Sequence, residues 1–191
     1  MTEDAKSLTE PPHSLGDPRE LLDAYLDYYR AVVLRKLDGL SEHELRHSRL
    51  PSGWTPLELL GHLTWVERRW FQWGFAARPF PDPWGDRGPD GRWHVSEEDT
   101  LATLTARFEE ACAHSRALVA GIPAERRSAV GGRFPAEADA PPLGWILFHV
   151  LQEYARHAGH LDVVRELADG RVGEAAATPP RRDGGPGPAG G

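Results

Sequence analysis

Three side chains that could bind a divalent cation occur on two stretches with helical periodicity. Glu153 and His157 lie four residues apart, so in a helix their side chains meet on adjacent turns. His62 lies in an earlier stretch whose apolar residues repeat with the period of one helical face. An imidazole from one helix and a carboxylate–imidazole pair from another would form a three-ligand site with open positions for water or substrate.

The helical face that carries Glu153 and His157 also carries apolar residues and His160. Burying a carboxylate without a partner would be strongly unfavourable, so something must compensate Glu153. A cation is one possibility. The residues leave two others open: a hydrogen bond between Glu153 and His157, or an ion pair with Arg69, which follows His62 by two helical turns. His62 by itself could be a core histidine satisfied by one hydrogen bond.

Other reactive side chains carry weaker signals. His160 follows His157 by three residues and could orient a ligand or act as a general base. His149 lies at the edge of the apolar face, where it is predicted to make a hydrogen bond between helices. Cys112 falls in an apolar helical stripe and is predicted to be unreactive. The sequence has no GxSxG, Walker, dinucleotide-binding or HExxH motif, so it gives no support to those reaction classes.

Four amphipathic stretches predict the helices that would position these side chains, over about residues 17–37, 55–77, 97–120 and 144–170. Asp17 before a proline, and Thr55 with Glu58, are helix-start signals, and Ser96 is expected to cap the third helix. A single helical turn is predicted near 41–45. The long irregular connection 78–95 is of a kind that is usually functional or spans a domain. The sequence therefore predicts an all-α four-helix bundle.

Composition and charge limit the domain extent, the partners and the cellular compartment expected for this protein. The chain of 191 residues fits one domain, 17–170, with a polar lead-in at 1–16 and a Pro/Gly-rich tail at 171–191 that are both expected to be disordered. A net charge of −7 argues against nucleic acid as a general partner. One cysteine and no apolar run near 18 residues predict a cytoplasmic protein with no membrane partner. A homodimer is compatible with this composition.

The segments TPLELLGHLTWVERRW and EYARHAGHLDVVRELADG together resemble the DinB superfamily, and most closely its branch related to mycothiol-dependent maleylpyruvate isomerase. The resemblance covers about residues 18–170. It implies a four-helix bundle in up-down-down-up order, in which the second and third helices are parallel and the long 78–95 loop runs back between them. It also implies that His62, Glu153 and His157 bind a divalent metal, with Zn²⁺ or Ni²⁺ expected.

The resemblance further implies an enzyme that uses a low-molecular-weight thiol such as mycothiol. The expected reaction is transfer of this thiol to a small electrophilic substrate, or isomerisation of its adduct, with His160 or Arg69 orienting the substrate. Two alternatives use the same three ligands. One is hydrolysis by water activated at the cation. The other is a non-catalytic module, stapled by the metal, that binds a small ligand.

Overall fold

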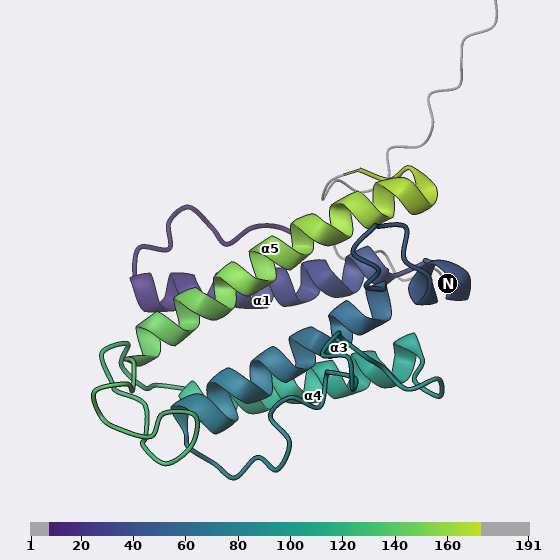
Figure 1. Ribbon diagram of the computed structural model, residues 1–191. Coiled ribbons are helices and arrows are strands. Elements are labelled where there is room, and N and C mark those ends of the chain that lie inside the picture. The colour runs from purple at the N-terminus through teal and green to yellow at the C-terminus, as the bar shows by residue number, and fades with distance from the viewer. Residues whose placement is uncertain (1–7, 173–191) are drawn as a thin grey trace, which may run out of the picture.

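The computed structural model describes residues 8–172, which form a bundle of helices (Figure 1). The elements are α1 (Pro18–Leu37), α2 (Glu42–Arg46), α3 (Pro56–Glu67), the π-helix η1 (Arg68–Phe75), α4 (Leu101–Val119) and α5 (Leu143–Asp169). Within this part of the chain, β-pairing is limited to isolated bridges in the loops. The all-α prediction is therefore confirmed.

Capping side chains fix the starts of the first two long helices as the sequence indicated. Asp17 accepts hydrogen bonds from two backbone N–H groups of the first turn of α1. At α3, Thr55 and Glu58 form a reciprocal capping box, with distances of 3.3 Å and 2.7 Å. These bonds satisfy N–H groups that have no partner inside the helix.

The third long helix begins later than predicted. Ser96 does not cap it. Its backbone N–H instead donates to the Asp99 carboxylate at 3.0 Å, which closes a turn before the helix. Thr100 then caps α4, and its own backbone N–H donates to Thr103. The two threonines provide the reciprocal pair that a capping box needs, so the helix starts at Leu101.

A π-helix, η1, continues α3 and was not predicted. A π-helix has i→i+5 hydrogen bonds and therefore a wider turn than the 3.6-residue α-helix. The bond from the Ala76 backbone N–H to the Phe71 carbonyl, at 3.0 Å, has this spacing. The wider turn changes which side chains face inward. Phe71 and Arg69 are buried, whereas Trp73 is only partly buried.

Contacts at the helix ends show how the four long helices run. Arg165, near the end of α5, donates to the Lys36 carbonyl near the end of α1 at 3.0 Å. Arg19, at the start of α1, donates to the Val119 carbonyl at the end of α4 at 3.0 Å. Helices α1 and α5 therefore run in one direction, and α3 and α4 lie beside them in the other (Figure 1). Residues 76–100 connect η1 to α4 and run back along the bundle to reach the start of α4.

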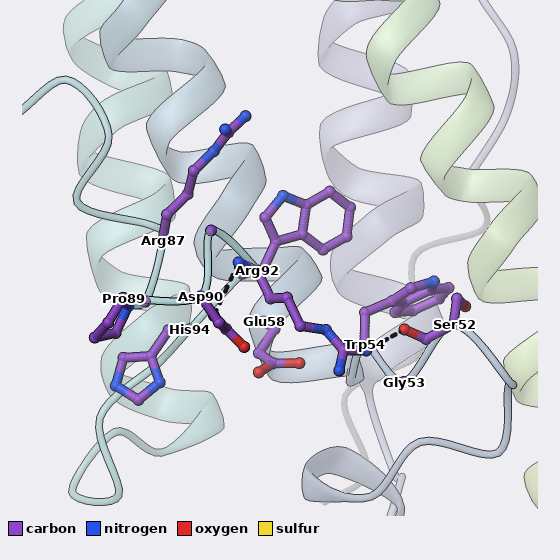
Figure 2. A pocket seen from close by; sticks show the side chains of 12 residues that line it. Ser52, Gly53, Trp54, Glu58, Arg87, Pro89, Asp90, Arg92 and His94 are labelled. Atoms are coloured by element: carbon purple, nitrogen blue, oxygen red, sulfur yellow. Dashed lines mark hydrogen bonds between the residues drawn. The ribbon is translucent and has the colours of Figure 1, made fainter.

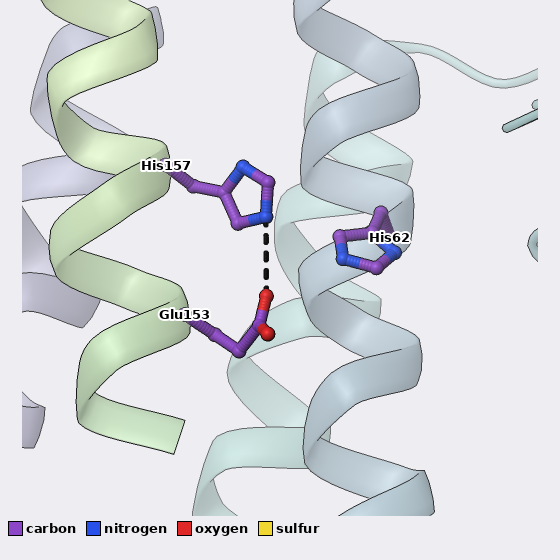
Figure 3. Close-up of side chains that lie close together, drawn as sticks. All are labelled: His62, Glu153 and His157. Atoms are coloured by element: carbon purple, nitrogen blue, oxygen red, sulfur yellow. Dashed lines mark ion pairs between the residues drawn. The ribbon is translucent and has the colours of Figure 1, made fainter. Parts of the chain in front are cut away.

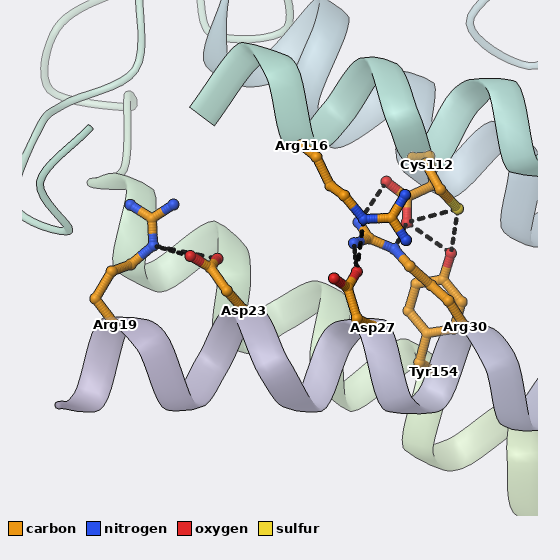
Figure 4. Close-up of polar contacts among 8 residues, drawn as sticks. Arg19, Asp23, Asp27, Arg30, Cys112, Arg116 and Tyr154 are labelled. Carbon is orange, nitrogen blue, oxygen red and sulfur yellow. Dashed lines mark hydrogen bonds and ion pairs between the residues drawn. The ribbon is translucent and has the colours of Figure 1, made fainter. Parts of the chain in front are cut away.

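A polar network crosses the apolar core and joins the four long helices (Figure 4). Glu67 at the end of α3 is fully buried. Arg30 of α1 donates two hydrogen bonds to its carboxylate, at 2.9 and 3.0 Å. The Tyr154 hydroxyl of α5 donates to the same carboxylate at 2.6 Å. Cys112 Sγ of α4 lies 3.7 Å from the Glu67 carboxylate. Burial first, and then the charge of Glu67, raise the pKa of the Cys112 thiol. These contacts agree with the prediction that Cys112 is unreactive.

The tails are described only in part. Residues 1–7 and 173–191 lie outside the described residues, so most of the predicted tail at 171–191 does too. Of the predicted lead-in, Leu8 packs against a small apolar cluster of Tyr28, Val32 and Ala158. No helix in the described part of the chain is both long and apolar enough to cross a membrane.

Candidate metal centre

His62, Glu153 and His157 come together between α3 and α5 (Figure 3). One potential ligand atom from each lies within 4.8 Å of those of the other two. Glu153 Oε2 is 3.3 Å from His157 Nε2, and the rings of His62 and His157 meet edge to face, with their centres 5.2 Å apart. His157 is buried, whereas the other two are partly exposed. The structure thus brings together the three residues that the sequence singled out.

Asp86, from the connection between η1 and α4, orients His62. Its Oδ2 lies 2.9 Å from His62 Nδ1. We assign the ring proton to Nδ1, because it then donates to the carboxylate and Nε2 keeps its lone pair for a cation. Arg69 donates two hydrogen bonds to the same carboxylate, at 2.6 and 3.0 Å. Burial alone would raise the pKa of Asp86, but the hydrogen bonds from His62 and Arg69 hold it below its usual range.

The partner of Arg69 corrects one expectation from the sequence. An ion pair between Arg69 and Glu153 was considered, but the structure pairs Arg69 with Asp86. Asp86 itself was not singled out, because it lies in an irregular connection where no periodicity indicates which side chains face inward. Its position in a long loop with tryptophans was the only available signal.

His160 contacts the Nδ1 atom of His157, on the side of the ring away from Glu153. Its Nδ1 lies 3.2 Å from His157 Nδ1, so one of the two rings donates to the other. If His157 donates, its Nε2 stays free on the side that faces Glu153. His160 is largely exposed, although the sequence placed it on the buried face. A residue three positions after His157 is rotated by about 60° around the helix, which is enough to reach the surface.

Glu153 also has a neighbour on the preceding turn. His149 Nε2 lies 3.6 Å from Glu153 Oε1, and its ring stacks on Trp145 and packs against Trp70. Its polar contact is therefore within α5, and its contact with another helix is aromatic, unlike the hydrogen bond that was predicted. Contact with His157 first, and then the charges of the nearby imidazoles, lower the pKa of Glu153. The carboxylate is thus kept available as a ligand.

A polar pocket of about 630 Å³ lies beside the centre (Figure 2). Trp54 and Trp93 belong both to its lining and to the surroundings of the histidines. The Trp93 ring stacks on His62 with 4.2 Å between ring centres, and the Trp54 ring lies 5.9 Å from that of His160. The rest of the lining includes Glu58 and charged residues of the 87–94 loop. The two indoles therefore separate this pocket from the three candidate ligands.

Comparison with known proteins adds one finding. The sequence model of a family described as mycothiol S-transferase matches residues 21–170. The match extends from α1 to the end of α5 and includes all three candidate ligands and Asp86. A search of curated proteins finds no match to the chain.

Proposed function

Since the chain belongs to the mycothiol S-transferase family, part of the DinB-like superfamily, we propose that it is a metal-dependent enzyme that transfers a thiol such as mycothiol to a small electrophile. The observation that supports this proposal best is the meeting of His62, Glu153 and His157, with the His62 ring oriented by a buried carboxylate. The thiol sulfur would form a bond to carbon as the leaving group departs, and the thiol proton would pass to solvent.

The donor set fits a divalent cation. Two neutral imidazoles and one carboxylate are ligands that Zn²⁺ and Ni²⁺ accept, and they leave positions open for a substrate. A divalent cation bound there lowers the pKa of a coordinated thiol, so that thiolate is present at neutral pH. Asp86 and His160 hold the two imidazoles in the required orientation. Arg69 fixes Asp86, so its contribution is to position the His62 ring.

The pocket beside Trp54 and Trp93 is proposed to hold the body of the thiol. Mycothiol carries its cysteine on a hydroxyl-rich sugar–inositol unit, and indole faces with nearby carboxylates suit such a group. The Glu58 and Asp90 side chains line this pocket. Because the Trp93 ring lies between the pocket and His62, a thiol whose body occupies the pocket would extend its cysteine past the edge of this indole towards the three ligands.

The proposal is tested by following thiol consumption with an uncharged electrophile, 4-(bromomethyl)benzamide, and mycothiol. The zinc-loaded protein is expected to accelerate the reaction above its uncatalysed rate. A chelator should remove the acceleration and added Zn²⁺ should restore it. Cys112→Ser is the matched control and should keep the activity, because the buried Cys112 is not the nucleophile in this scheme. If no chelator-sensitive turnover of thiol or hydrolytic substrates appears across a broad panel, the non-catalytic metal-stapled module replaces the enzyme.

Asp86→Asn is expected to weaken binding of Zn²⁺ by about 10–100-fold, the usual effect of losing a carboxylate that orients a histidine ligand. The amide has no charge to hold the Nδ1 proton, and its NH₂ group could favour the wrong tautomer. Affinity is measured by competition with a fluorescent chelator. Asp90→Asn, an exposed change in the same connection, should leave the affinity unchanged. Equal affinities for wild type and Asp86→Asn would show that Asp86 does not support a ligand.

A further inference from the structure

Arg133 is a cation whose guanidinium lies against three aromatic rings. Its guanidinium carbon lies 4.2 Å from the centre of the Trp70 ring, 5.8 Å from that of Trp73 and 5.9 Å from that of Trp84. No carboxylate of the described residues forms an ion pair with it, whereas the buried arginines Arg30, Arg69 and Arg165 each have one. Arg69, for example, is bound to Asp86.

The chain holds Arg133 in this position through close backbone packing on η1. The Arg133 backbone N–H donates to the Trp73 carbonyl at 3.2 Å. Gly132 makes this approach possible, because a Cβ at that position would lie 2.2 Å from the same carbonyl oxygen. The Arg133 side chain then passes over Gly74, within 3.7 Å of where a Cβ would stand. Two glycines and the wide turn of the π-helix therefore place the guanidinium among the tryptophans.

The positive charge of Arg133, which has no ion-pair partner among the described residues, favours the binding of an anion. Burial, then repulsion from Arg69, lower the pKa of its guanidinium, so its surroundings disfavour the charge that it carries. Stacking on indole rings offsets part of this cost. It leaves the N–H groups at the edge of the guanidinium free, and these form paired hydrogen bonds with carboxylates or phosphates. A bound anion would supply the missing charge.

Contacts link this arginine to the metal centre from two directions. The Trp70 ring packs against His149, with 4.2 Å between ring centres, and His149 contacts Glu153. The Trp84 ring lies 4.8 Å from the guanidinium of Arg69. Arg69 in turn binds Asp86, the carboxylate that orients His62. Along α5, His149 precedes the two ligands, whereas His160, beside the polar pocket, follows them. Arg133 and the pocket therefore lie on different sides of the centre.

We infer that Arg133 binds the anionic group of the electrophile, so that the protein prefers substrates carrying a carboxylate at a distance from the reacting carbon. This inference rests on the proposed thiol transfer. In the resulting arrangement, the thiol approaches the centre from the side of Trp54 and Trp93, and the acidic electrophile from the side of Trp70 and Trp84. The two substrates thus meet at the centre without sharing a pocket.

The test compares two electrophiles of the same shape, 4-(bromomethyl)benzoate and 4-(bromomethyl)benzamide. In each, the thiolate displaces bromide from the CH₂ carbon, and only the first carries a negative charge across the ring. Arg133→Gln is expected to lower kcat/KM for the benzoate reagent by about tenfold or more, the effect of losing a hydrogen bond to a charged group. The benzamide reagent should react almost as before. Arg133→Lys should recover part of the loss.

Arg126→Gln is the matched control, because it removes the same charge from an exposed position of the same connection. It should change neither rate. Equal losses with both reagents for Arg133→Gln, or no loss with either, would overturn the inference. Melting curves of all variants show whether a loss reflects unfolding.

A binding measurement separates this inference from the proposed function. Calorimetric titration with benzoate and benzamide requires no turnover. Wild type should bind benzoate, and Arg133→Gln should lose most of this affinity while Arg126→Gln keeps it. If wild type catalyses neither reaction but binds benzoate through Arg133, the transfer proposal fails and the anion site stands. If benzoate binds wild type and Arg133→Gln equally, or does not bind at all, the anion site is wrong.

Discussion

Protein carrying both His62→Ala and His157→Ala is expected to contain no tightly bound divalent cation after purification and dialysis, whereas the wild type is expected to contain close to one per chain. The double change removes two of three candidate ligands and leaves a single carboxylate, which cannot hold a transition metal against buffer. Metal content is measured by elemental analysis. Undiminished metal in the double variant would show that the cation binds elsewhere.

The control removes the same number of imidazoles from the surface. His43 and His47 stack on one another on α2 and its C-cap, with 4.2 Å between ring centres, and both are exposed. Their replacement by alanine should leave metal content unchanged. Melting curves give a second readout, because a bound cation stabilises the folded state. Chelator should lower the melting temperature of the wild type and of the control, but not that of the His62 and His157 variant.

Glu67→Leu is expected to destabilise the fold by about 3–5 kcal/mol, the usual effect of removing one partner from a buried ion pair. Arg30 would keep only its bond to the exposed Asp27, and the Tyr154 hydroxyl would lose its acceptor. The change is measured as the free energy of unfolding in urea. An unchanged unfolding midpoint would show that the buried carboxylate is not paired as described.

A second substitution separates the cost of the unpaired charge from the value of the pair. Adding Arg30→Met to Glu67→Leu removes both charges and fills similar volume, so it should recover most of the lost stability. Removal of Glu44 from its exposed pair with Arg49 on the surface should have little effect, since solvent screens such pairs. If the double variant is no more stable than Glu67→Leu, the loss comes from packing and not from charge.

The helices and the three candidate ligands could be predicted from the sequence because their signals are local. Capping residues lie within three positions of the backbone groups they satisfy, and Glu153 and His157 are one helical turn apart. Asp86 could not be found this way, since its contact with His62 spans 24 residues and its connection has no period. The pairing of Glu67 with Arg30 spans 37 residues, and Glu67 stands in a charged run that is typical of an exposed face.

The π-helix limited the prediction in a different way. At 100° per residue, Trp73 would lie on the same helical face as His62, but the wider turn of η1 changes the phase after Glu67. The residues after Glu67, including Arg69 and Trp70, therefore contact partners that α-helical periodicity does not indicate. The tryptophan cluster around Arg133 joins residues far apart in the sequence, so only the three-dimensional structure identifies it.

The pairing of α1 with α5 has a consequence for how the chain is made. The hydrogen bond from Arg165 to the Lys36 carbonyl joins residues 129 positions apart. A ribosome adds about 5–20 residues per second, so α1 emerges roughly 6 to 26 seconds before its partner. During this interval the apolar face of α1 has no α5 to cover it, and the nascent chain offers that face to chaperones or to other chains. The pairing of α1 with α5, and with it completion of the bundle, therefore waits for the end of translation of this domain.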